Sequence, residues 1–156
     1  MKKHISSSIA IIATVAISIF TVHAANVHFK SAPKTTDNGT TATVCATLTG
    51  LGNGDLTITL IGSGIRSTSC LNPAGNFAPG NPGQVAVGGV TTVPASEIKN
   101  GNVSFCVTTE SPECASANAC GCPNNNWAAT VTDVDFTSLT LVVEQGGKVV
   151  LQQTVK

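Results

Sequence analysis

The sequence predicts an all-β fold, an immunoglobulin-like sandwich of two antiparallel sheets stabilised by disulfides. Three observations support this prediction. Apolar and polar residues alternate in short runs along most of the chain, no run has the periodicity of a long helix, and six cysteines occur in 156 residues. Strands that alternate in this way have one apolar face each, and two sheets packed face to face bury these faces. A closed barrel is the alternative architecture.

Period-two alternation predicts the first long strands. Residues 41–48 alternate aliphatic side chains with threonines, and this run ends at the Gly/Asn turn "GLGNGD". Residues 56–60 then resume the alternation. Gly62 and Gly64 are expected to mark a bulge or bend before a further strand at 65–70.

The second half of the chain continues the pattern. The segment "CLNPAGNFAPGNPG" is rich in proline and glycine and is expected to be an irregular surface loop. The segment "VPASEIKNG" supports one helical turn at most. Seven to nine short strands are expected in all. The remaining ones are expected at 27–29, 84–93, 103–108, 127–134 and in a hairpin, 139–151, around Gly146-Gly147.

Residues 1–24 are predicted to be a secretory signal peptide, and residues 25–156 a single secreted domain. Two lysines precede an apolar run, 9–20, which is shorter than the roughly 20 residues that a membrane span needs. Small residues precede the expected cleavage site. A secreted, periplasmic or cell-surface location follows from this prediction.

Charge is sparse in the predicted mature chain. Residues 25–156 contain six Lys or Arg and eight Asp or Glu, a net charge of 6 − 8 = −2. We therefore expect no clustered basic surface for nucleic acid, and no basic amphipathic segment points to a membrane. No cofactor is expected. The expected partner is an unidentified protein or polysaccharide at the cell surface.

Three segments resemble a known group of proteins. "GLGNGDLTITL", "CLNPAGNFAPG" and "VTDVDFTSLTLVV" are similar to segments of small secreted bacterial proteins of unassigned function. Those proteins combine a Gly-Leu-Gly-Asn turn, a Cys-x-Asn-x-x-Gly loop and a late Cys-Pro. The resemblance covers most of the mature chain and implies a β-sandwich and a disulfide from Cys70 to Cys122. It implies no activity, and this chain departs from the pattern by four further cysteines.

The even number of cysteines in an exported chain indicates disulfides, although six cysteines allow 15 pairings. Cys45 and Cys106 lie on the threonine-bearing sides of two predicted strands and would meet if these strands pair in register. Cys114 and Cys120 lie in one loop that their bond would close. With the bridge that the resemblance implies, the expected set is Cys45–Cys106, Cys70–Cys122 and Cys114–Cys120. The competing pattern exchanges Cys120 and Cys122.

A metal or redox site is the alternative for the segment "PECASANACGCPNNNW". Its three sulfurs, with Cys106 as a fourth, would suffice for zinc, but the paired C-x2-4-C hooks of structural zinc sites are missing. A C-x-C redox pair would lack the βαβ surroundings of thioredoxin-like proteins. No metal site is predicted.

Candidate catalytic residues are few. His28 is the only histidine after the predicted signal peptide, no "GxSxG" occurs, and His28 is expected to face solvent on a strand. Asp133 and Asp135 share one face of a strand and, with Glu110, are the residues that a metal-dependent hydrolase would use. Their alternative is the charged solvent face of an edge strand. No catalytic residue is predicted.

The long loops are the expected recognition surface. Phe77 lies in the proline/glycine loop, where it either closes the end of the domain or contacts a partner, and Asn76 precedes it. Asn124 and Asn125 follow the late Cys-Pro. Trp127 is expected to pack in the core beside a disulfide rather than to form an exposed platform for carbohydrate.

These observations favour a secreted, non-enzymatic β-sandwich. It would be an envelope, surface or matrix protein, or a recognition protein that works through its loops. A fimbrial-type structural subunit and a small secreted metal-dependent hydrolase are the alternatives.

Overall fold

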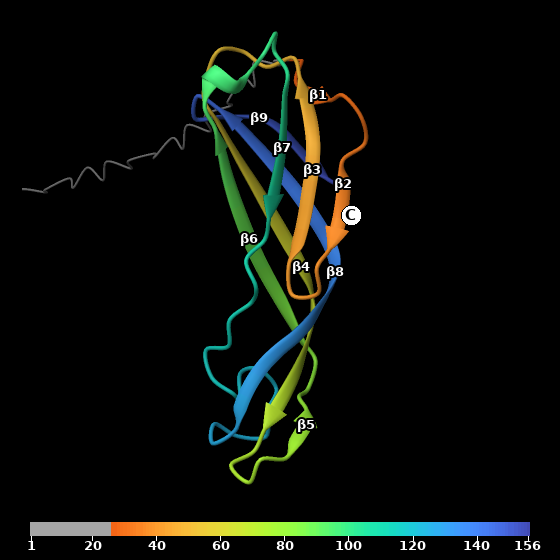
Figure 1. Ribbon diagram of the computed structural model, residues 1–156, viewed down its shortest axis with the longest axis vertical. Coiled ribbons are helices and arrows are strands. Elements are labelled where there is room, and N and C mark those ends of the chain that lie inside the picture. Colours follow the sequence, from red (N-terminus) through yellow and green to blue (C-terminus); the bar gives the residue numbers. More distant parts are fainter. Residues whose placement is uncertain (1–25) are drawn as a thin grey trace, which may run out of the picture.

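Residues 26–156, which the computed structural model describes, consist mostly of strands (Figure 1). The predicted signal peptide, 1–24, lies outside the described residues. In chain order the elements are β1 (His28–Phe29), β2 (Lys34–Asp37), β3 (Ala42–Thr49), β4 (Leu56–Leu71), β5 (Phe77–Pro79), β6 (Gly83–Val93), the 3-10 helix η1 (Ala95–Glu97), β7 (Val103–Thr108), β8 (Ala128–Gln145) and β9 (Lys148–Thr154). No helix among residues 26–156 is long and apolar enough to cross a membrane.

The strands form two antiparallel sheets packed face to face, which confirms the predicted two-sheet sandwich. In the four-stranded sheet, β3 pairs with β7 along one edge and with β1 and β2 along the other. In the five-stranded sheet, β4 pairs with β8 along one edge and with β6 and β5 along the other, and β9 pairs with β8.

The hydrophobic core lies between the four-stranded sheet and one half of the five-stranded sheet. Leu56, Ile58 and Leu60 of β4 are fully buried, as are Val44 and Leu48 of β3. These are the residues whose alternation with threonine predicts the strands, so the aliphatic face of each run is the face turned inward.

The two longest strands were each expected as two shorter pieces. Residues 56–71 form one continuous strand, and so do residues 128–145. The pairing of β4 with β8 shifts register twice, and each shift leaves one extra residue on β8, Thr132 or Thr137. A bulge of this kind interrupts strict alternation without ending the strand, so a period-two pattern fails there.

Both bulges have the same local chemistry. The Thr137 hydroxyl donates to the Ser63 carbonyl at 3.2 Å, and the Thr132 hydroxyl donates to the Ser67 carbonyl at 3.3 Å. Each of these carbonyls lies at a register shift, where the backbone ladder is disrupted. The threonine side chain therefore supplies a donor to the neighbouring strand at the point where the ladder is broken.

The proline/glycine segment is more ordered than expected. Residues 77–79 form β5, which pairs with Ser69–Leu71 of β4 and makes this segment a hairpin. The Asn72 side chain closes its turn, because Asn72 Oδ1 accepts from the Asn76 amide at 2.8 Å. Gly75, with a φ of +83°, takes the left-handed conformation that the turn needs.

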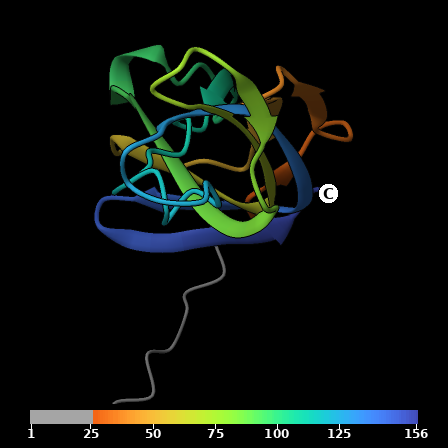
Figure 2. The same ribbon diagram turned by 90° about the horizontal axis from the view of Figure 1, so that it is seen from below.

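The five-stranded sheet extends beyond the four-stranded one (Figure 1). We call residues 65–82 and 110–133 the distal end; it lies at the bottom of Figure 1 and is seen from below in Figure 2. Here a long loop, 110–127, takes the place of a second sheet. The rest of the described chain is the sandwich end.

Candidate functional site

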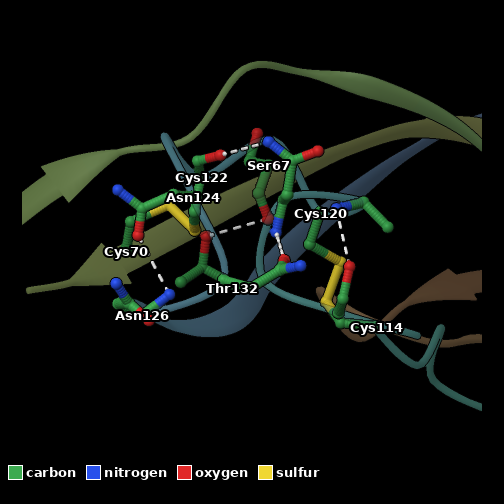
Figure 3. The surroundings of a disulfide bond; sticks show 12 residues. Ser67, Cys70, Cys114, Cys120, Cys122, Asn124, Asn126 and Thr132 are labelled. Atoms are coloured by element: carbon green, nitrogen blue, oxygen red, sulfur yellow. Dashed lines mark hydrogen bonds between the residues drawn. A yellow bond between two sulfur atoms is a disulfide. The ribbon is translucent and has the colours of Figure 1, made fainter.

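Three disulfides join the six cysteines in the pairs proposed from the sequence. Cys45–Cys106 links β3 to β7 on the outer face of the four-stranded sheet. Cys70–Cys122 and Cys114–Cys120 lie together at the distal end (Figure 3). Three disulfides fit a protein of an extracellular or other oxidising compartment.

The cysteine-rich loop has a compact internal structure. The Cys120 and Cys122 amides both donate to the Ala117 carbonyl, and Cys120 also donates to the Ser116 carbonyl. Ser116 Oγ accepts from the Ala119 amide at 3.1 Å, as the hydroxyl of a helix N-cap does. These bonds form a single helix-like turn that the Cys114–Cys120 disulfide closes.

The loop is attached to the five-stranded sheet by hydrogen bonds as well as by the Cys70–Cys122 disulfide. Arg66, on the inward face of β4, donates from Nη2 to the Ala119 carbonyl at 2.6 Å. The Asn81 amide donates to the Gly121 carbonyl at 2.9 Å. Gly121 has a φ of +89°, and a Cβ there would overlap the Asn81 backbone. Only glycine fits this contact, which brings the backbone of the loop against that of the β5–β6 connection.

Arg66 is not among the residues predicted from the sequence, although the alternation of β4 indicates its orientation. It shares its face of β4 with Leu56, Ile58 and Leu60, so the alternation alone places its side chain inward. Its Nε is shielded from solvent and has no hydrogen-bond partner among the described residues. The same holds for Thr68 Oγ1, the next inward position of β4.

The structure places the four predicted recognition residues on two segments that Cys70–Cys122 joins. Phe77 and Asn76 belong to the β4–β5 hairpin, and Asn124 and Asn125 belong to the loop. Phe77 pairs with Leu71, and on its other side Leu71 pairs with Ala128. Two strand spacings, about 10 Å, therefore separate Phe77 from the start of β8.

The four residues differ in what they do locally. Asn125 Oδ1 accepts from the Asn118 amide and Asn124 Oδ1 accepts from the Asn126 amide, both at 2.9 Å (Figure 3 shows the second bond). These asparagines therefore help to fold the loop as well as covering it. Phe77 is 75 % exposed, so of its two expected roles it does not close the end of the domain.

Trp127 does not lie in the core. It precedes β8, is only partly buried, and is not one of the side chains packed against the core cluster. Along β8 the core cluster reaches Val134, and Val131 packs against it, whereas Trp127 precedes the tip of this strand. The expectation that Trp127 is a core residue is therefore wrong.

The candidate catalytic residues lie apart. His28 is exposed on β1 at the sandwich end, and its Nδ1 is 2.8 Å from the Asn26 carbonyl oxygen. Asp133 and Asp135 are exposed on the outer face of the five-stranded sheet, opposite Ser67 and Ile65. Within residues 26–156, no group of three or more His, Cys, Asp or Glu is arranged to hold a metal ion.

The distal end brings three kinds of group together. It offers an exposed aromatic ring, backbone held by disulfides, and asparagine side chains on neighbouring turns. Comparisons with known proteins do not name a family: no family model and no curated protein matches the chain.

Proposed function

We propose that the protein is a secreted, non-enzymatic β-sandwich that works in the cell envelope or extracellular matrix. Its distal end recognises a protein or polysaccharide at the cell surface. The observation that carries this proposal is the exposure of Phe77 on a hairpin that a disulfide joins to the neighbouring loop.

The exposed ring is the first support. An aromatic side chain that is 75 % exposed leaves a large apolar surface in water, and aromatic residues are the commonest anchors of protein interfaces. Phe77 lies on the outer face of the sheet beside Leu71, so the two side chains form one small apolar area.

Rigidity is the second support. Binding is weakened by the entropy lost when loops become ordered, so a surface that is ordered beforehand binds more tightly. Cys70–Cys122 joins the hairpin to the loop and Cys114–Cys120 closes the loop, so the distal end is ordered before a partner arrives.

Strand order supports an immunoglobulin-like classification of the sandwich. If β3 and β7 correspond to strands B and E, then β6, β4, β8 and β9 follow as C′, C, F and G. The disulfide between sheets that is typical of antibody domains would join B to F, whereas here β3 is bonded to β7 within one sheet. The proposed likeness is therefore one of strand order and not of disulfide pattern.

Binding to intact cells of the producing organism and to its purified envelope polysaccharide tests the proposal. We expect Phe77→Ala to weaken binding at least tenfold, as truncation of an interface anchor does. Val90→Ala is the matched control, because Val90 is 63 % exposed on the sandwich half of the same sheet. Equal binding by both variants, or turnover of a substrate that Asp133→Asn abolishes, would overturn the proposal.

A further inference from the structure

The outer face of the four-stranded sheet carries a row of paired side chains. Thr43 and Thr108 share a hydrogen bond of 2.8 Å between their hydroxyls, and so do Thr47 and Ser104. The Cys45–Cys106 disulfide lies between these two pairs. The row runs from Thr43 to Thr47 of β3, which is four residue steps, or about 13 Å.

Each hydroxyl pair keeps one free donor. Two hydroxyls carry two hydrogens, and the bond between them uses one, so the other can point to a ligand. Because the partners hold each other across the strands, the hydroxyl oxygens are already positioned. The face therefore carries one hydroxyl pair on each side of a disulfide.

Two adjoining hollows lie over part of this row, over the Thr47–Ser104 pair and the Cys45–Cys106 disulfide. Their volumes are about 650 and 410 Å³, and Thr47 and Ser104 line both of them. The segment 30–34 borders one side, and residues 96–102, which begin within η1, border the other. Together the hollows form one open trough along β3 and β7.

Cationic side chains gather at this trough. Lys30, Lys34 and Lys99 line it, against a single acid, Glu97, so the trough carries 3 − 1 = +2. Lys99 is held at the rim because its Nζ donates to the Ser96 carbonyl at 2.8 Å. Residues 26–156 contain six cations and eight acids, a net charge of 6 − 8 = −2 for this part of the chain, so half of its cations lie at the trough.

We propose that this trough binds an acidic polysaccharide, a glycan strand that carries carboxylate or sulfate groups. The lysine ammonium groups would pair with the anionic groups, and the free donor of the Thr47–Ser104 pair would bond to a sugar oxygen. Among the residues that line the trough, the one aromatic side chain, Phe105, is 7 % exposed, so it offers no platform on which the bases of a single-stranded nucleic acid could stack. This surface is separate from the distal end and does not depend on the function proposed for it.

The test measures binding of the full secreted protein to polygalacturonate and to dextran sulfate, with uncharged dextran for comparison. We expect binding to both acidic polymers, none to dextran, and an affinity that falls as salt is added. Changing all three lysines, Lys30→Gln, Lys34→Gln and Lys99→Gln, should weaken binding about tenfold, as the loss of three partly screened ion pairs predicts.

A matched pair of double variants separates the site from net charge. The double variant Lys30→Gln, Lys34→Gln should bind the acidic polymers more weakly than the unchanged protein. The double variant Lys148→Gln, Lys156→Gln removes the same charge outside the trough, and its affinity should stay within about twofold of that of the unchanged protein. Equal losses, equal binding to dextran, or tighter binding to a polyglutamate peptide than to either glycan would overturn the proposal. Phe77→Ala should not change these affinities, so this test stands apart from that of the distal end.

Discussion

The two ends of this molecule are stabilised in different ways, although β4 and β8 run through both. At the sandwich end the inward positions of β4 are Leu56, Ile58 and Leu60, all fully buried in the core. Beyond two glycines, the inward positions of the same strand become Arg66, Thr68 and Cys70. One face of one strand therefore changes from aliphatic to polar and disulfide-bonded along its length.

The two ends also differ in the kinds of residue that they bury. The core cluster consists of aliphatic and phenylalanine side chains, whereas the buried residues of the distal end are Thr68, Cys70, Cys120 and Cys122. A loop cannot contribute the continuous apolar face that a second sheet does. Covalent bonds and backbone contacts through glycine take the place of hydrophobic burial there.

Truncation of one phenylalanine at each end should give the largest difference in the free energy of unfolding between the two ends. Phe136 is 1 % exposed in the core, so Phe136→Ala should lower the free energy of unfolding by about 3–5 kcal/mol. Phe77→Ala should change it by less than about 0.5 kcal/mol, since that ring is mostly in water. Urea unfolding followed by tryptophan fluorescence measures both. Similar losses of unfolding free energy in the two variants would mean that the β4–β5 hairpin forms a second hydrophobic core.

Removal of one or the other distal disulfide should give the next largest difference in the free energy of unfolding. Cys70–Cys122 closes 52 residues, so replacing both cysteines by alanine should lower the unfolding free energy by about 4 kcal/mol in the chain-entropy model. Cys114–Cys120 closes six residues, and its removal should cost about 2 kcal/mol.

Thermal unfolding of the two double-alanine variants provides the comparison. Limited proteolysis adds a local reading, because loss of Cys70–Cys122 should expose residues 110–127 to cleavage while the sandwich end stays resistant. If loss of Cys114–Cys120 proved the more damaging, the short bridge would have a structural role beyond closing its loop.

Substitution by alanine at two glycines of the distal end should give the smallest difference in the free energy of unfolding. Gly75→Ala should lower the free energy of unfolding by about 1–2 kcal/mol, the cost of the left-handed conformation alone, because nothing lies within 4 Å of the new methyl group. Gly121→Ala meets the Asn81 backbone as well, and we expect a loss of about 3 kcal/mol. Equal values for the two variants in urea unfolding would show that the loop shifts freely away from the β5–β6 connection.

Prediction from the sequence succeeded where a pattern is local. The alternation around Val44 and Ile58 predicts both the strands and the side that faces inward. It failed at Thr137, where a bulge resets the alternation, and so β8 was expected as two strands. Trp127 was expected in the core because the sequence does not reveal how far the core extends along β8.

By itself the sequence determined the all-β class and the inward face of most strands, because these depend on period-two alternation and on residue type. It left the exchange of Cys120 and Cys122 open, and the structure shows Cys70–Cys122 and Cys114–Cys120. Only the tertiary structure decided that the four-stranded sheet covers half of its partner, that Arg66 lies beneath a loop, and that three lysines border one trough. Those features depend on strand pairing between residues far apart in the chain. Lys30 and Lys99 come together because β3 pairs with both β1 and β7, and no local pattern records that pairing.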